Sequence, residues 1–289
     1  MSLIPLDTEH SDYEIISPIV NYIIGRVGNI DQLSLKIPPI FRQAVDEVID
    51  APRTNRFTID ELEKTEKTYL GTKVEILLRN LLKLPKGNIL DLSIEGVEVD
   101  IKNTIGQNWT IPLESYNRPA ILTKFDEKKA ICSFGVIYIR PEYLNVGKNR
   151  DSKRSISITG KNNIWWILKD YPYSKNFWET IPESEINFII SSGKGTLRIA
   201  TFFEKIQGVP ISRQCIHDIA QQNDYMKRIR KNGGARDILN PKKIAILWGK
   251  KDRTLIAELG LPILKDDEFI SYKAITNDAF IKLSKAGHL

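Results

Sequence analysis

The chain has 289 residues, of which 42% are apolar and 27% charged, so it is long enough for two globular domains with separate cores. It has no apolar run near the roughly 18–20 residues of a membrane span, no secretion signal and only two cysteines, so we expect a cytoplasmic protein without a membrane anchor, a disulfide framework or a structural zinc site. Residues 1–160 hold 21 Lys and Arg against 22 Asp and Glu, whereas residues 161–289 hold 21 against 14, and such a basic region is compatible either with a nucleic-acid partner or with a merely soluble surface.

The first 150 residues mix helical and strand patterns. Apolar residues at three- and four-residue spacing predict helices over residues 16–29, 40–49 and 57–83. Alternating or continuous apolar runs predict strands over residues 89–94, 97–101 and 130–139. This mixture predicts a mixed α/β core in the N-terminal part of the chain.

Residues 91–102 have the pattern of a tight β-hairpin with Glu95-Gly96 as its two-residue turn. The predicted register pairs Ile94 with Val97, Ser93 with Glu98, Leu92 with Val99, and Asp91 with Asp100. The turn is not the favoured Asn-Gly pair, so this register is a hypothesis for the structure to test.

The polar face of this hairpin carries a candidate catalytic group. Alternation puts Glu98, Asp100 and Lys102 on one face, and Asp91 joins them because directly opposed residues share a face. The two aspartate Cβ atoms would lie about 5 Å apart, and a divalent cation such as Mg²⁺ cancels the resulting repulsion. An ammonium beside them suits activation of water or stabilisation of phosphate charge, as phosphodiester hydrolysis requires. A solvated strand face is the equally weighted alternative.

A polar stretch from residue 148 to residue 163 precedes a second region, and we place the boundary between the two near residues 160–175. Beyond it, the patterns predict helices and then a strand, over residues 194–207, 212–222, 224–232 and 243–248. Ser212 is a candidate N-cap of the second of these helices. Short helices followed by a strand are typical of a helix-turn-helix domain.

Polar side chains suited to DNA gather between residues 221 and 236. The cations among them are Lys227, Arg228, Arg230, Lys231 and Arg236. Clustered cations suit contact with phosphates or entry into a groove. Gln221, Gln222 and Asn223 precede them and have amides of the kind that pair with adenine, although a polar loop is the preferred interpretation of these three from the residues alone.

Three segments, in this order and spacing, resemble the NaeI family of type II restriction endonucleases. They are EKTEKTYLGTKVEI (63–76), IEGVEVDIK (94–102) and IAQQNDYMKRIRKNGGARDIL (219–239). The third is the most specific, because so long a run is unlikely to recur by chance. The resemblance extends from about residue 40 to residue 263, and the two ends of the chain match poorly.

The resemblance implies an endonuclease core of the PD-(D/E)xK type with a mixed sheet over residues 1–165. It implies a catabolite-activator-like helix-turn-helix (winged-helix) domain over residues 166–289, and a homodimer that binds two DNA duplexes, one of them as an effector. By position, the family's catalytic residues fall on Glu75, Asp91, Asp100 and Lys102. The three acids are then the ligands of Mg²⁺. Ile101 stands where a cysteine is expected, on the apolar face.

The main hypothesis is therefore an Mg²⁺-dependent type II restriction endonuclease. The alternatives are a helix-turn-helix regulator with an inactive nuclease domain, or a nicking or strand-passage enzyme on the same fold. The presence of all four catalytic-type residues argues against the regulator. The sequence gives neither the recognition site, the cleavage position, the methylation sensitivity, nor whether a second DNA site is obligatory.

Overall fold

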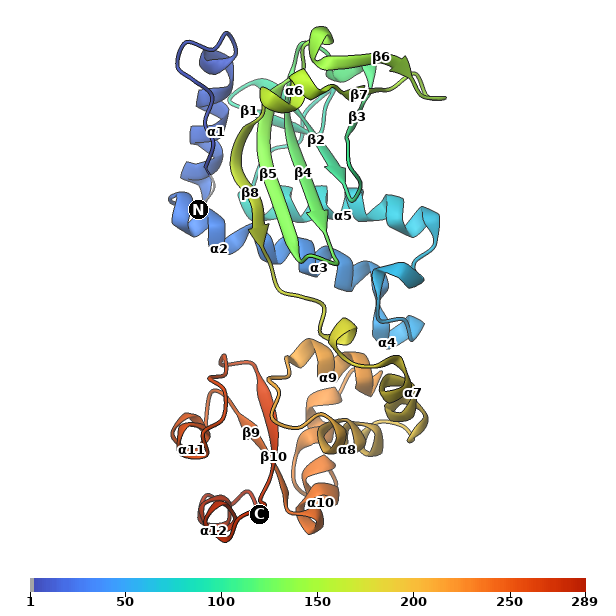
Figure 1. Cartoon of the computed structure of the whole chain (residues 1–289), viewed down its shortest axis with the longest axis vertical. Helices are drawn as coiled ribbons and strands as arrows, with labels where there is room; N and C mark the ends of the chain where they lie inside the picture. The colour runs from blue at the N-terminus through green and yellow to red at the C-terminus, as the bar shows by residue number, and fades with distance from the viewer. Residues whose placement is uncertain (1–2) are drawn as a thin grey trace. The chain divides into compact units, whose positions relative to one another are not determined.

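The protein forms two compact units (Figure 1), seen in a computed structural model that describes residues 3–289. Unit 1 comprises the chain up to Ile49 together with Thr58–Asn176, and unit 2 comprises Asp50–Phe57 together with Phe177–Leu289. The expected division between residues 165 and 166 falls at the start of a strand, β8 (Trp165–Pro172), that pairs with β5 (Ile131–Tyr138) in unit 1. The structural division therefore comes later in the chain, after Asn176.

A five-stranded sheet forms the centre of unit 1, in the order β1-β2-β4-β5-β8. Its first three strands are β1 (Leu92–Ile94), β2 (Val97–Thr104) and β4 (Pro119–Asp126). Strands β2 and β4 run parallel, whereas the other neighbours run antiparallel. The predicted strands over residues 89–94, 97–101 and 130–139 correspond to β1, β2 and β5, and the mixed α/β character is confirmed.

The predicted hairpin register is confirmed for the three pairs that β1 and β2 form, from Leu92 opposite Val99 to the turn. Glu95 and Gly96 have φ angles of 49° and 84°. Positive φ at both central residues is the geometry that a two-residue hairpin turn needs to match the twist of its strands. The turn therefore forms even though a glutamate occupies the position that usually holds asparagine.

Four longer helices belong to unit 1: α1 (Tyr13–Val27), α2 (Ile30–Lys36), α3 (Pro38–Ile49) and α5 (Lys64–Leu82). Helix α3 packs on α5, α5 packs on β2, and α1 packs on β5. The prediction of one helix over residues 57–83 is wrong at its beginning, where a 3₁₀ turn, η1 (Ile59–Glu61), comes first. Helix α5 starts later because the backbone N–H of Glu63 donates to Glu66 Oε2, 2.8 Å away, as in a capping box.

A smaller sheet of three antiparallel strands covers one end of unit 1. Its strands are β3 (Thr110–Ile111), β7 (Arg154–Ile156) and β6 (Leu144–Lys148), in that order, and α6 (Ile158–Asn162) follows β7. Two further 3₁₀ turns, η2 (Leu113–Ser115) and η3 (Pro141–Tyr143), connect it to the main sheet. The polar stretch of residues 148–163, whose composition is typical of an interdomain segment, therefore contains strand β7 and the β6–β7 turn.

The N-terminal segment, whose role the sequence left open, is tied into unit 1 at two places. Ile4 forms an antiparallel bridge with Trp166 of β8 through backbone hydrogen bonds of 2.8 and 3.0 Å. Asp12 is fully buried, and its carboxylate accepts hydrogen bonds from Arg140 Nε at 2.6 Å and from the Tyr143 hydroxyl at 2.9 Å. These contacts hold the start of α1 against the end of β5.

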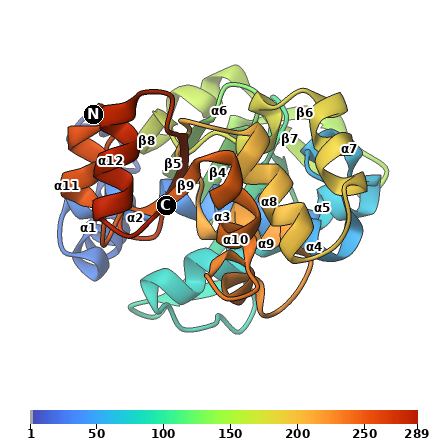
Figure 2. The same ribbon diagram turned by 90° about the horizontal axis from the view of Figure 1, so that it is seen from below.

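Unit 2 is built around a two-stranded antiparallel ribbon of β9 (Ile244–Trp248) and β10 (Phe269–Lys273). Its helices are α4 (Ala51–Thr54), α7 (Glu183–Ser191), α8 (Thr196–Lys205), α9 (Arg213–Ala220), α10 (Ala235–Leu239), α11 (Arg253–Glu258) and α12 (Asn277–Lys285), with 3₁₀ turns η4 (Phe177–Thr180) and η6 (Asn240–Lys242). The ribbon lies between α11 and α12 on one side and α8 and α10 on the other (Figures 1 and 2). Among residues 3–289, no helix has the length and apolar character needed to cross a bilayer.

The predictions for unit 2 are partly confirmed. Helices α8 and α9 and strand β9 lie within the predicted ranges, and the Ser212 hydroxyl caps α9 by accepting the Cys215 N–H at 3.2 Å. The helix predicted over residues 224–232 is wrong, since this segment forms only a 3₁₀ turn, η5 (Tyr225–Ile229). Arg230 is extended, and Asn232 has a φ of 64°, so the backbone cannot continue as a helix.

Replacing Asp12 with alanine is expected to destabilise unit 1 by about 3 kcal/mol, because it leaves Arg140 and the Tyr143 hydroxyl without their shared partner. The expected loss of stability is at the low end of the range for a broken buried ion pair, because the side chain of Arg140 is partly exposed to solvent. Urea denaturation of the full chain measures it, with the exposed Glu14→Gln as the matched control. Equal transition midpoints for the two variants would show that the network does not stabilise the fold.

Candidate active site

The β1–β2 hairpin brings three of the four predicted catalytic residues together. The Lys102 ammonium lies 2.5 Å from Asp100 Oδ1 and 3.9 Å from Asp91 Oδ2. Asp91 immediately precedes β1, and its Oδ2 accepts the backbone N–H of Ile101 at 2.8 Å. One cation is therefore shared by two carboxylates from adjacent strands, as the alternation of β2 predicts.

Asp100 is the most firmly held of these groups. Its side chain is only 3% exposed, Oδ1 accepts from Lys102, and Oδ2 accepts from the hydroxyl of Ser115. Ser115 is itself fully buried, at the end of η2. With a donor on each oxygen, the Asp100 carboxylate cannot rotate freely. No local pattern marked Ser115, because a turn fifteen residues downstream brings it to the site.

Asp91 has a strongly perturbed acidity. Burial, followed by the hydrogen bond and charge of Asp100, raises the pKa of Asp91 to about 7. The backbone N–H of Ile101 acts in the opposite direction and does not overcome these effects. The site therefore carries more negative charge than Lys102 alone can balance.

The loop that leads into Asp91 is fastened by Glu98 of β2. The Glu98 carboxylate accepts three backbone N–H groups, those of Asn88, Ile89 and Leu90, at 2.8 to 3.0 Å. These hydrogen bonds lower the pKa of Glu98. A Cβ atom at Gly87 would lie 2.5 Å from Glu98 Oε2, so the loop can close on this carboxylate only with glycine there. Glu98 thus sets the position of Asp91 rather than joining the acid pair.

Glu75, the fourth predicted residue, comes from α5, which packs against β2. Burial raises the pKa of Glu75, while the charge of Arg79, 3.8 Å from it, acts in the opposite direction. The charges of Lys102 and Asp100 also act on it, which places it in the same electrostatic neighbourhood. Among residues 3–289, however, no three His, Cys, Asp or Glu side chains are grouped closely enough to hold a metal ion.

The acid pair nevertheless has the chemistry of a site for a hard divalent cation. Mg²⁺ binds through one or two carboxylates, keeps several waters and fills the rest of its shell with phosphate oxygens. Asp91 and Asp100 supply two carboxylates that share the single positive charge of Lys102. The chemistry of these two residues fits Mg²⁺.

The predicted DNA-binding residues of unit 2 do not form one surface. Gln221 is held within the fold, since Arg198 Nη1 donates to its Oε1 at 2.6 Å and its Nε2 donates to Asn55 at 3.0 Å. Gln222 is partly buried beside Gly195, and Arg228 is paired with Asp224. Of the remaining predicted residues, those exposed on the surface are Asn223, Lys227, Arg230 and Lys231.

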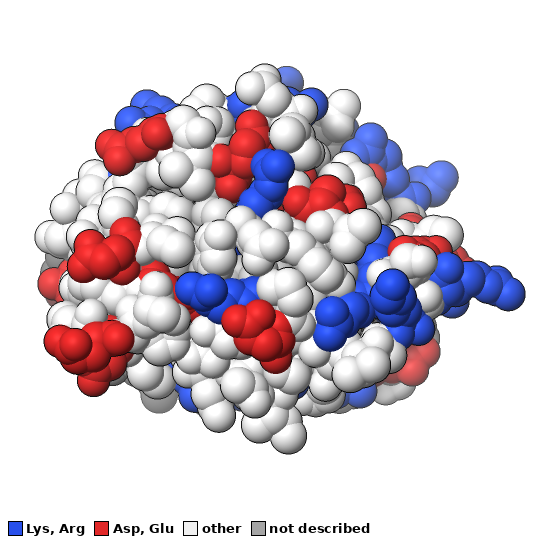
Figure 3. Space-filling view, turned by 90° about the horizontal axis from the view of Figure 1, so that it is seen from above, with Lys and Arg blue, Asp and Glu red and all other residues white. Residues whose placement is uncertain are grey.

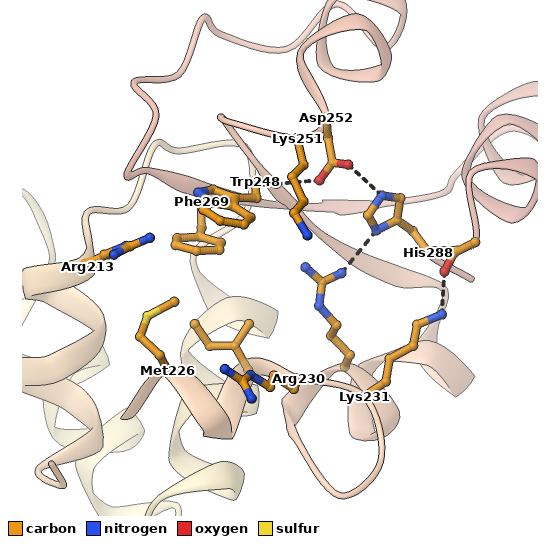
Figure 4. Close-up of a pocket in the computed structure, with 12 residues that line it drawn as sticks. Arg213, Met226, Arg230, Lys231, Trp248, Lys251, Asp252, Phe269 and His288 are labelled. Carbon is orange, nitrogen blue, oxygen red and sulfur yellow. Dashed lines mark hydrogen bonds and ion pairs between the residues drawn. The ribbon is translucent and has the colours of Figure 1, made fainter. Parts of the chain in front are cut away.

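Three of the predicted cations instead meet around a pocket. Arg230, Lys231 and Arg236 line a cavity of about 680 Å³ in unit 2 (Figure 4). Two further cations from distant parts of the sequence, Arg213 and Lys251, complete its lining. The sequence did not reveal these two, because they become neighbours only in the folded unit, where α9 and the residues after β9 line the same pocket.

A second basic feature lies on unit 1. Lys and Arg side chains project at the edge that β6 and β7 form (Figure 3). Lys148 at the end of β6 and Arg150 in the turn are exposed, and Lys153 and Arg154, which lead into β7, are partly exposed. Acidic and basic side chains are interspersed over the rest of the face shown.

Comparison with known proteins gives one consistent result. A family model described as "Restriction endonuclease NaeI" matches residues 26–279. A curated relative, "Type II restriction enzyme NaeI" of Lentzea aerocolonigenes, is 32% identical over 248 residues, which covers 83% of this chain and 78% of the relative. The matched range contains the acid pair, Lys102 and all the cations of the unit 2 pocket.

The raised pKa of Asp91 predicts a pH dependence of stability in metal-free protein. Between the ordinary carboxyl value of 3.8 and about 7, the folded state keeps a proton that the unfolded state has lost, so the free energy of unfolding falls as pH rises through this window. Asp91→Asn is expected to flatten that fall. Denaturation in EDTA at several pH values measures it, with the exposed Asp151→Asn as control. The same slope in both variants would contradict the assignment.

Proposed function

The chain belongs to the NaeI family of restriction endonucleases, and we propose that it cuts both strands of duplex DNA at a short palindromic sequence as a type II enzyme. The observation that carries the proposal is the meeting of Asp91, Asp100 and Lys102 at one edge of the β1–β2 hairpin. A family match alone would also admit an inactive homologue, whereas this geometry retains the groups that phosphodiester hydrolysis needs.

Each of these residues has a part in the proposed reaction. Mg²⁺, held by Asp91 and Asp100, would supply a Lewis acid that withdraws charge from the scissile phosphate. Asp100 also orients the Lys102 ammonium, which hydrogen-bonds either to the attacking water or to a phosphate oxygen. The water oxygen bonds to phosphorus as one water proton passes to solvent, the bond from phosphorus to O3′ breaks, and O3′ takes up a proton from solvent. The products are a 5′-phosphate and a 3′-hydroxyl.

Glu75 acts at longer range in this proposal. It is half-buried on α5, and its charge couples to both Asp100 and Lys102 without a direct contact. A bridging water suits this separation. We therefore assign Glu75 to positioning water within the site rather than to direct ligation of the cation.

Unit 2 is the proposed second DNA-binding unit, of helix-turn-helix type. The packed helices α8 and α9, followed by the β9–β10 ribbon, are the elements that support this assignment. Asn223, Lys227 and Arg230 are exposed and free to contact a duplex. The basic side chains of this unit favour phosphate contacts whose strength falls with salt. We further propose a homodimer that binds two duplexes, one as effector.

The function is tested by incubating the purified chain with unmethylated plasmid and phage DNA, in Mg²⁺ and in EDTA. Discrete double-strand fragments that require Mg²⁺ are expected, and sequencing their ends gives the site. Asp100→Ala and Lys102→Ala are expected to reduce cleavage by at least about 10²–10³-fold while DNA binding persists. Lys128→Ala, an exposed lysine outside the site, is the control.

Cleavage by both variants at the normal rate would refute the assigned site. DNA that is bound but left intact, on substrates with many different sequences, would favour the alternative of a DNA-binding regulator with an inactive nuclease domain.

Ser115→Ala is expected to slow cleavage about tenfold and to raise the Mg²⁺ concentration needed for half-maximal rate. Loss of the hydroxyl frees Asp100 Oδ2 and also costs about 1–3 kcal/mol of stability, because a buried acceptor loses its donor. Cleavage rates over a Mg²⁺ titration at a temperature where the variant stays folded separate the two effects. If the cleavage rate of Ser115→Ala depends on Mg²⁺ concentration as that of the unchanged protein does, then Ser115 has only a structural role.

A further inference from the structure

The pocket of unit 2 combines a strong positive charge with an aromatic wall. Five Lys and Arg side chains line it, against one acid, Asp252. Its volume of about 680 Å³ lies within the range of cavities that enclose small organic ligands. Its walls come from α9, η5, α10, the β9–β10 ribbon and the C-terminal residues Gly287 and His288. This is a different part of the chain from the acid pair of unit 1.

Both carboxylate oxygens of Asp252, the one acid in the lining, already accept hydrogen bonds from within the chain. Asp252 Oδ2 accepts the backbone N–H of Trp248 at 2.7 Å, and Oδ1 accepts from His288 Nε2 at 3.1 Å. His288 Nδ1 lies 3.1 Å from Arg236 Nη1. Arg236 is always a donor, so Nδ1 accepts and the imidazole proton sits on Nε2. The chain Asp252–His288–Arg236 therefore fixes the guanidinium without neutralising the pocket.

The other cations remain available to a ligand. Among residues 3–289, no carboxylate pairs with Arg213, Arg230 or Lys251. Figure 4 shows the Arg213 guanidinium and the Lys251 ammonium reaching toward the space that Trp248 and Met226 border. Burial lowers the pKa of Arg236, and the charge of Asp252, which acts in the opposite direction, does not overcome this effect. A bound anion would remove this excess of positive charge.

The aromatic wall is rigid and flat. Trp248 stacks on Phe269 with ring centres 5.8 Å apart and planes 11° from parallel. The Trp248 Nε1–H donates to the carbonyl of Asp266 at 2.6 Å, which fixes the ring in its plane. Arg213 and Lys251 lie 5.7 and 5.4 Å from the Trp248 ring centre, so cation and aromatic surface are presented together.

We propose that this pocket binds one unpaired nucleotide, with its phosphate among Arg213, Arg236 and Lys251 and its base against Trp248. Fixed aromatic rings accept any base face, Arg binds two phosphate oxygens at once, and Lys binds phosphate as a point charge. A base stacked inside a duplex has no free face to lay against Trp248, so the ligand is a free nucleotide or the unpaired end of a strand. The proposed duplex contacts of Asn223 and Lys227 lie outside this lining, whereas Arg230 borders both sites.

The test is a titration of the full chain in EDTA, where no cleavage occurs, with deoxyadenosine monophosphate, with inorganic phosphate, and with a duplex bearing a 5′-phosphorylated single-stranded overhang. Quenching of tryptophan fluorescence and calorimetry follow binding, and a blunt duplex of the same sequence is the comparison. We expect the nucleotide to bind at least about tenfold more tightly than phosphate, because stacking adds to the ionic contacts. Tighter binding of the overhang than of the blunt duplex indicates a strand end as the source, and equal binding of the two duplexes indicates the free nucleotide.

The variants assign the signal to the pocket. Lys251→Gln and Arg213→Gln are expected to weaken nucleotide binding about five- to tenfold each, whereas Lys250→Gln, at the exposed neighbour outside the lining, leaves it unchanged. Trp248→Phe keeps an aromatic ring and is expected to remove most of the fluorescence change. The proposal fails if no saturable binding occurs at millimolar nucleotide, if phosphate binds as tightly as the nucleotide, or if Lys251→Gln and Lys250→Gln bind alike. None of these outcomes depends on whether unit 1 cuts DNA.

Discussion

Repulsion between the Asp91 and Asp100 carboxylates is the constraint around which unit 1 is arranged. Two neighbouring carboxylates favour neutralisation by a proton or a cation, and the charge of Asp100 adds to burial, which is the largest cause, in raising the pKa of Asp91. The surrounding structure holds both groups in place against that repulsion. Ser115 and Lys102 each bind one oxygen of Asp100, and Glu98 gathers the loop before Asp91 through three backbone N–H groups. Several ordinary hydrogen bonds together thus offset the unfavourable free energy of holding the two carboxylates close to each other.

The sequence predicted those features of the site that follow from strand alternation and turn geometry within one short segment. Alternation with period two and a two-residue turn set the register of β1 and β2, and the observed pairs agree. The grouping of Asp91, Asp100 and Lys102 follows from that register, because opposed residues share a face. Glu75 needed the family resemblance, since nothing within α5 distinguishes it from a solvated glutamate. Its catalytic role, like those of the other three residues, stays a proposal.

The features that the sequence did not predict depend on tertiary contacts or on backbone geometry. Ser115 reaches Asp100 from a separate turn, and Arg213 and Lys251 meet across the fold of unit 2. The segment over residues 224–232 has helical composition, yet it forms only a 3₁₀ turn before the positive φ angles of Asn232 and Gly233. Strand β8 begins where the boundary between units was expected, because a short charged stretch inside a domain has the same composition as a linker.

The bridge between Ile4 and Trp166 has a consequence for the behaviour of the protein in solution. Strand β8 is an edge strand of the sheet and would otherwise present unpaired backbone groups on its outer side. Strands from other molecules can pair with such an edge. At the opposite edge of the sheet, β1 is only three residues long and has few free backbone groups with which another strand could pair. The bridge at Ile4 thus protects part of this edge against aggregation, and loss of this bridge would leave the catalytic residues intact while lowering the solubility of the protein.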